Sequence, residues 1–264
     1  MRIATWESLV DMALADGDEL LTTESTNIQR AVAANNRGYD AAGKKQYDLA
    51  IAKFNEALEL HATYPEALNN RALAKAAQHL VEDALADFDR AIELKPEFST
   101  AYNNRGMVLH EIGDYRRALG DFSKAIDWNP RLAPAFSNRG ISRTAVGDFE
   151  SAIGDFNRAI ELQPRFAPAF FNRGFVLAGW DRLDAAIKDY TRAIELDDEL
   201  ALAWFCRGDL WRSKGDSHRA IFDYSSAIAT NANFVLAQLH RAEAQEELSK
   251  SEQAAQTVRP SRKL

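Results

Sequence analysis

One triplet recurs along the chain at a fixed interval of 34 residues. It reads Asn-Arg followed by Gly or Ala, and its five copies begin at Asn36, Asn70, Asn104, Asn138 and Asn172. A constant period of this size is typical of a solenoid, in which each unit buries its apolar face only against its neighbours. The period therefore argues against a single compact core and predicts one elongated array of repeats.

The pattern within each repeat indicates two helices. If Ala31 is position 1, the chain divides without gaps into six units, 31–64, 65–98, 99–132, 133–166, 167–200 and 201–234. Small residues occupy positions 8, 20 and 27, and an aromatic ring always occupies position 24. Apolar residues at positions 20, 21, 24, 27 and 28 form one helical stripe. We expect helix A over about positions 1–14 and helix B over about positions 18–31, with the ring packed between them.

These residues closely resemble the tetratricopeptide repeat (TPR) family, whose pattern alternates large, small and aromatic residues over 34 positions and usually ends in proline. The resemblance covers residues 31–234 and extends into a seventh A helix. It implies an all-α fold, a right-handed superhelical TPR solenoid of helix–turn–helix repeats. It also implies that the A helices line the concave wall, with positions 2, 5, 6, 9, 12 and 13 facing inward.

The segments outside the repeats suggest terminal structures. Residues 1–30 contain apolar side chains between positions 5 and 21 that predict a further helix, followed by a linker. Residues 235–249 keep the register of an A helix but carry polar side chains, as a capping helix should. Residues 250–264 end in a short basic stretch that we expect to be disordered.

The inward positions of the A helices are the candidate peptide-binding site. Position 6 carries the five asparagines, and an amide can donate to and accept from a peptide backbone at once. The alternative is that these asparagines join adjacent A helices to each other. Apolar side chains at position 9, and phenylalanines at position 5 in the last two units, would contact a ligand's apolar groups. The candidate residues are Asn36, Asn70, Asn104, Asn138, Asn172, Met107, Ile141, Phe171, Phe175 and Phe205, with Tyr39 and Leu73 in the same position-9 column.

Position 7 is arginine in every unit, and five of the six B helices carry aspartate at position 23. The first unit instead has Lys53 and Glu56 at positions 23 and 26, which suggests an i,i+3 ion pair between these positions. We expect each position-7 arginine to reach an acid on its own or a neighbouring helix B. This arginine column is therefore predicted to be structural.

Composition and motifs exclude several functions. A net charge of −7 disfavours nucleic-acid binding, and no apolar run approaches the roughly 18 residues of a membrane span. The single cysteine, Cys206, excludes an intrachain disulfide and fits a reducing compartment. The start of the chain shows no secretory segment, so we expect a cytoplasmic location. No phosphate-binding loop, dinucleotide fingerprint, nucleophile elbow or zinc motif is present, so we expect a protein that is not an enzyme and uses no cofactor or metal.

We therefore expect a protein–protein interaction scaffold or adaptor that binds an extended peptide segment in the concave groove. Co-chaperones of the family hold a terminal carboxylate with basic side chains at positions 2, 5 and 6. Here position 5 carries Asn, Ser or Phe in all six units, so that clamp is expected to be absent. Two alternatives stay open: a structural assembly factor acting through self-association or the N-terminal helix, and a substrate-recruiting subunit of a separate enzyme.

Overall fold

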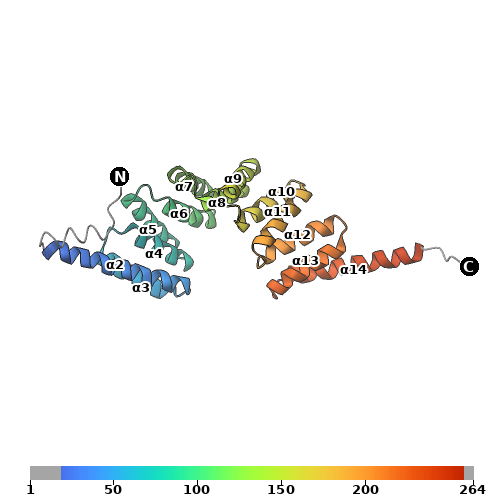
Figure 1. The fold of residues 1–264 in the computed structure, drawn as a ribbon, viewed down its shortest axis with the longest axis horizontal. Coiled ribbons are helices and arrows are strands. Elements are labelled where there is room, and N and C mark those ends of the chain that lie inside the picture. The colour runs from blue at the N-terminus through green and yellow to red at the C-terminus, as the bar shows by residue number, and fades with distance from the viewer. Residues whose placement is uncertain (1–18, 259–264) are drawn as a thin grey trace, which may run out of the picture. The chain divides into compact units, whose positions relative to one another are not determined.

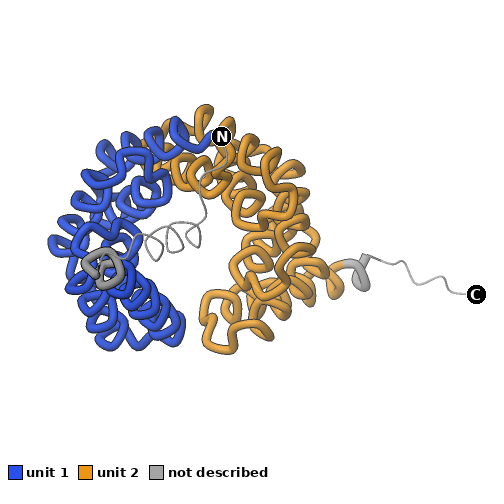
Figure 2. Tube along the Cα trace, turned by 60° about the vertical axis from the view of Figure 1, so that its left-hand side comes forward, with its two compact units in different colours: residues 1–130 blue, residues 131–264 orange. Residues whose placement is uncertain are grey.

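In the computed structural model the described chain runs from residue 19 to residue 258, and every regular element within these limits is an α-helix (Figure 1). The helices group into two compact units, Met1–Pro130 and Arg131–Leu264 (Figure 2). Within each unit A and B helices alternate along the chain. This confirms the predicted all-α solenoid of helix–turn–helix repeats.

The helix boundaries follow the 34-residue register. The A helices are α2 (Glu19–Gly43), α4 (Pro65–Ala77) and α6 (Ser99–Glu111) in the first unit, and α8 (Ala133–Ala145), α10 (Ala167–Gly179), α12 (Ala201–Ser213) and α14 (Val235–Val258) in the second. The B helices are α3 (Tyr47–Leu60), α5 (Val81–Leu94) and α7 (Tyr115–Trp128), then α9 (Phe149–Leu162), α11 (Leu183–Leu196) and α13 (Ser217–Thr230). From α4 to α13 the A helices cover positions 1–13 and the B helices positions 17–30, within one residue of the predicted bounds.

The position-24 ring fills the space between the two helices of a repeat. All six rings are at most 1% exposed: Phe54, Phe88, Phe122, Phe156, Tyr190 and Tyr224. A Cβ atom built on Gly106 would lie 2.8 Å from the Phe122 ring, and one built on Gly38 would lie 2.6 Å from the Phe54 ring. The glycine therefore lets helix A approach the ring more closely than a side chain would allow.

The turn from helix A to helix B has one backbone conformation throughout. Position 15 takes a positive φ in every repeat, at Lys45, His79, Gly113, Gly147, Asp181 and Gly215. The aspartate that follows three of these residues caps helix B: Asp114 accepts a hydrogen bond from the Arg117 amide at 3.1 Å, and Asp148 and Asp216 do the same one and three repeats later.

Both ends of the array differ from the expected pattern. Helix α2 begins at Glu19, so the described part of segment 1–30 continues the first A helix without a linker. The rest of the predicted N-terminal helix lies outside the described residues. Helix α14 extends nine residues past the predicted cap to Val258, because most of 250–258 is Ala, Gln, Glu or Lys, which favour helix, and the segment has no Gly or Pro. The predicted disorder of the tail is therefore wrong for 250–258, and the basic residues beyond lie outside the described range. None of the described helices combines the length and hydropathy of a membrane span.

Candidate peptide-binding surface on the A helices

The arginine column fixes the A helices to the B helices. In five repeats the position-7 guanidinium donates two hydrogen bonds to the position-23 aspartate, as in Arg105 to Asp121 at 2.7 Å from both Nε and Nη2. The other four pairs are Arg71–Asp87, Arg139–Asp155, Arg173–Asp189 and Arg207–Asp223. All five aspartates are buried. The expected structural role of these arginines is confirmed.

Several of these arginines also connect neighbouring repeats. The Nη1 atom of Arg71 donates to Asn55 at 2.7 Å, and that of Arg105 donates to Asp89 at 2.6 Å. Both partners stand at position 25 of the preceding B helix. Arg173 and Arg207 repeat the arrangement with Asn157 and Thr191. One guanidinium therefore holds its own helix B and the previous one at a fixed separation.

The first repeat keeps the ion pair but exchanges its partners. Lys53 donates to Glu56 at 2.8 Å, which is the predicted i,i+3 pair, and Arg37 reaches the same Glu56 at 2.8 Å. In other repeats position 26 bonds position 29 instead, as in Arg90–Glu93, because the position-23 aspartate is already taken by the arginine column. The i,i+3 pairing of positions 23 and 26 is therefore limited to the first repeat.

The position-6 asparagines form a hydrogen-bonded column in the first unit. Asn70 Nδ2 donates to Asn35 Oδ1 at 3.1 Å, and Asn104 Nδ2 donates to Asn69 Oδ1 at 3.0 Å. Each acceptor is a buried position-5 asparagine of the preceding A helix. At Asn70 and Asn104 the asparagines therefore join adjacent A helices to each other, which is the alternative given for this column.

Asn36 and Asn172 are placed differently. Asn36 is exposed and Asn172 is half-buried, and neither side chain hydrogen bonds to any other described residue. Position 5 of the repeat before Asn172 is Ser137, so the acceptor that Asn70 and Asn104 use is missing there. Asn138, which follows Asn104 and precedes Asn172 in the column, is also half-buried. Asn36 and Asn172 therefore keep the full bonding capacity of their amides.

Apolar side chains at position 9 are open to solvent on the same helices. The exposed fractions are 68% for Tyr39, 39% for Leu73, 40% for Met107 and 57% for Phe175. Ile141 is half-buried and packs beside Ala152, Phe156 and Val176. The position-9 column lies three residues after the asparagine column, so each amide and its apolar neighbour share one helix face.

The two position-5 phenylalanines pack between helices. The Phe171 ring lies 5.7 Å from that of Tyr190. The Phe205 ring contacts those of Tyr224, Phe234 and His240, at centroid distances of 4.9 to 5.9 Å. Both side chains are partly buried, whereas Phe175 at position 9 of α10 is 57% exposed.

A cavity of about 340 Å³ opens beside Phe175 in the second unit. Its walls are mainly apolar and come from α8 to α12: Thr144, Phe149, Phe175, Val176, Ala178, Gly179, Trp180, Tyr190, Cys206, Asp209 and Leu210. Burial raises the pKa of the Cys206 thiol to about 11, so the cysteine in this wall stays protonated at neutral pH. Sequence reasoning missed this cavity. The signal was the pair of small residues Ala178 and Gly179 at positions 12 and 13, next to Phe175 and Trp180.

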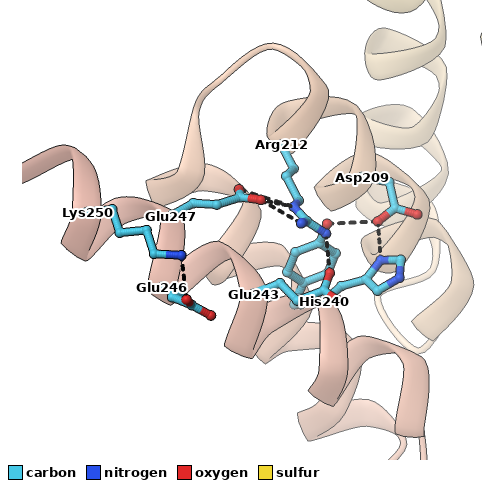
Figure 3. Close-up of polar contacts among 8 residues, drawn as sticks. Asp209, Arg212, His240, Glu243, Glu246, Glu247 and Lys250 are labelled. Carbon is cyan, nitrogen blue, oxygen red and sulfur yellow. Dashed lines mark hydrogen bonds and ion pairs between the residues drawn. The ribbon is translucent and has the colours of Figure 1, made fainter.

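A polar cluster adjoins the cavity where α12 packs on α14 (Figure 3). Asp209 Oδ1 accepts a hydrogen bond from the Tyr224 hydroxyl. The same oxygen lies 2.8 Å from His240 Nδ1. One turn further along α12, Arg212 donates to Glu243 and Glu247, each at 2.6 Å. Asp209 is therefore held in position from α13 and α14, while Arg212 is occupied by acids of α14.

The sequence profile of the tetratricopeptide repeat family matches residues 35–97, 69–135 and 138–201. The chain belongs to the TPR family. The TPR profile covers the same helix pairs that carry the arginine, asparagine and position-9 columns. No curated protein sequence matches the chain significantly.

Solved TPR structures share this architecture. The crystal structure of YrrB, described as a TPR protein with an unusual peptide-binding site, is 27% identical with a TM-score of 0.54, over 72% of this chain and 97% of YrrB. PilF of Pseudomonas aeruginosa is 16% identical with a TM-score of 0.72, over 84% of this chain and 99% of that one. A chain of the APC/C hetero-tetramer Cut9–Hcn1 is 16% identical with a TM-score of 0.74, over 90% of this chain and 51% of its own length. The last two likenesses bear on the fold alone.

TPR units are in general interaction scaffolds that present helix surfaces to other proteins. Within residues 19–258, no three side chains of His, Cys, Asp or Glu come together in a way that could hold a metal ion. On the A helices, position 6 carries amides with unused bonding capacity at Asn36 and Asn172, and position 9 carries exposed apolar groups at Tyr39, Leu73, Met107 and Phe175.

Proposed function

We propose that this TPR protein binds an extended segment of a partner protein along the face of its A helices. The position-9 side chains contact apolar groups of the segment, and the position-6 amides hydrogen bond its backbone. The observation that carries this proposal is the exposed position-9 column. Large apolar groups recur there on α2, α4, α6 and α10, and they stand one turn after the asparagine column on the same helix face.

The magnitudes favour the apolar column as the source of affinity. Burial of apolar surface contributes about 25 cal/mol per Å², so covering one large side chain stabilises a complex by roughly 1–2 kcal/mol. An exchanged hydrogen bond contributes only about 0.5–1.5 kcal/mol net. Asn70 and Asn104 already use part of their capacity within the column, which leaves Asn36 and Asn172 as the amides best placed to hold a peptide unit. Affinity in the micromolar range follows from a few such contacts.

The likeness to YrrB supports the class of ligand. That protein is described as having a peptide-binding site, and it aligns with most of this chain at 27% identity. The same TPR scaffold with exposed apolar groups on its A helices is suited to the same kind of ligand.

A second candidate function is self-association through the beginning of α14. Val235, Leu236 and Leu239 are each more than half exposed there, and Leu239 stands at position 5, which is buried or half-buried in the six earlier units. Light scattering on the purified protein tests this candidate. A monomer at high protein concentration removes it.

Peptide selection tests the proposed function directly. Random peptides of about twelve residues, long enough to extend across three A helices about 10 Å apart, are selected on the immobilised full chain. We expect the selected peptides to lose at least about tenfold in affinity, or about 1.4 kcal/mol, on chains carrying Leu73→Ser with Met107→Ser or carrying Phe175→Ser.

The matched control removes equally exposed apolar groups from outside the site. Leu49→Ser with Ile112→Ser changes side chains that are 47% and 50% exposed, on α3 and at the end of α6. Binding should be unchanged in this variant. If the control weakens the peptides as much as the position-9 variants do, or if no selected peptide depends on position 9, the A-helix face is not the binding surface.

A further inference from the structure

The cavity beside Phe175 combines an apolar wall with one carboxylate. Hydrogen bonding to the backbone of a bound segment requires neither of these features. We propose that this cavity takes a lysine or arginine side chain of the bound segment. The aliphatic stem lies against Phe149, Phe175 and Trp180, and the cationic group pairs with Asp209. This inference rests on the proposed function, because the basic residue belongs to the segment bound on the A helices.

The shape of the cavity suits a long side chain. Its volume of about 340 Å³ exceeds that of a single short aliphatic group. The space exists because α10 ends in Ala178 and Gly179, and a Cβ atom built on Gly179 would meet nothing within 4 Å. The rings of Phe149 and Trp180 are 6.2 Å apart in an edge-to-face arrangement and form one rigid side.

Asp209 supplies a charge where the preceding repeats supply apolar groups. It stands at position 9, which is Tyr39, Leu73, Met107, Ile141 and Phe175 in the earlier units. Only its Oδ1 atom is bonded, by Tyr224 and His240, and the Oδ2 atom has no partner among the residues that the structure describes. The side chain is 38% exposed. A fixed carboxylate with a free oxygen at the wall of an apolar cavity favours a cationic donor.

Neighbouring arginines do not pair with Asp209, whose contacts are the Tyr224 hydroxyl and the His240 ring. Arg212, the nearest arginine along α12, is held by Glu243 and Glu247 on α14 (Figure 3). Arg182 lies over the Trp180 ring with its Cζ atom 5.7 Å from the ring centroid. The same ring system therefore already accommodates one guanidinium by a cation–π contact.

Other occupants fit the cavity less well. An acidic side chain would meet Asp209 with the same sign of charge. A purely apolar side chain would cover the carboxylate without pairing it, and desolvating an unpaired polar group costs free energy. A lysine or arginine avoids both penalties, because its stem stays in apolar contact while its charged end is bonded.

The test selects for peptides that need the cavity. Random peptides are selected on the full chain and then depleted on the Gly179→Leu variant, whose added side chain fills the cavity. Gly154→Leu on α9 is the matched control, because a Cβ atom there also meets nothing within 4 Å and the residue lies outside the cavity. Circular dichroism melting of each variant verifies that the fold is kept.

We expect the remaining peptides to share a lysine or arginine. Replacing that residue by methionine should weaken binding about tenfold, and Asp209→Asn should weaken it by a similar factor, in line with a charge-assisted hydrogen bond. In the Asp209→Asn chain the methionine peptide should lose nothing further, because the two changes remove one interaction. Glu195→Gln, which removes the same charge from the exposed face of α11, should leave binding unchanged.

Two results would overturn the inference while sparing the proposed function. One is a set of cavity-dependent peptides that share no basic residue. The same holds if a shared basic residue is found but its replacement weakens binding to the Asp209→Asn chain as much as binding to the unchanged chain. The other is a selection in which every peptide depends on Leu73 and Met107 and none is weakened by Gly179→Leu. Peptides that depend on neither would remove the proposed function as well.

Discussion

Asparagines at one repeat position have different surroundings, and a single substitution at two of them separates structure from binding. Asn70 bonds Asn35 of the preceding helix, whereas Asn172 has no side-chain partner in the described part of the chain. We predict that Asn70→Ala lowers the free energy of unfolding by about 1–2 kcal/mol, because it leaves a buried amide without its donor. Asn172→Ala should leave stability within about 0.5 kcal/mol and weaken the selected peptides several-fold. Urea denaturation and peptide titration of both variants distinguish the two roles. Equal losses of stability would show that Asn172 is also structural.

The cysteine of the chain is a reporter for the cavity. Burial raises the pKa of Cys206 to about 11, and the thiolate is the reactive form. We predict that iodoacetamide alkylates the folded protein at pH 8 about a hundredfold more slowly than the urea-unfolded chain, whose thiol has an ordinary pKa. The rate should rise with pH up to about 11, since the folded thiol loses its proton only there. A plateau near pH 9 would mean that Cys206 is more open to water than its surroundings in the cavity wall imply.

At the scale of helices, the bidentate Arg–Asp pairs are the main polar connection between A and B. Asp121 is buried and receives two bonds from Arg105, which also bonds Asp89 on the previous B helix. We predict that Asp121→Ala lowers the free energy of unfolding by about 3 kcal/mol, because a largely buried guanidinium loses its partner. Replacing both residues, Arg105→Met with Asp121→Leu, should cost less than Asp121→Ala alone. Chemical denaturation of Arg105→Met, Asp121→Leu and the double variant gives the coupling energy of the pair, and simple additivity would show that the two groups act independently.

Much of this helix arrangement could be predicted from one sequence, because the constraints repeat. Gly106 against the Phe122 ring recurs with the same geometry in most units, and the bounds of the helices from α4 to α13 agree with the prediction within one residue. The hydrogen-bond partner of Asn70 could not be predicted, because it depends on which position-5 side chain of the preceding A helix lies next to it. The cavity was missed for a related reason. Ala178 and Gly179 are ordinary residues for a helix end, and only packing against α8 and α12 turns them into a void.

For the array as a whole, stability is a sum of repeat and neighbour terms, so the ends are its weakest part. The last B helix, α13, is covered on one side by α14: Ala220 and Tyr224 pack with Ala244, and His240 bonds Asp209. Truncation after residue 233 removes all of these contacts. We predict that it lowers the stability of the last repeat by about 3 kcal/mol or more, because a fully buried ring becomes exposed. Truncation after residue 249 keeps them and should have little effect.

Hydrogen exchange measured along the chain distinguishes these two truncations from a global loss of stability. In the shorter chain, protection should fall in α13 and α12, while α4 and α5 of the first unit keep theirs, because each repeat contacts only its neighbours. The cavity wall includes Cys206 and Asp209 of α12, so the same truncation should also speed alkylation of Cys206 and abolish peptides that depend on the cavity. A uniform loss of protection in every helix would instead indicate that the repeats unfold as one cooperative body, and the binding surface would then depend on the whole array rather than on the local packing of α10, α12 and α14.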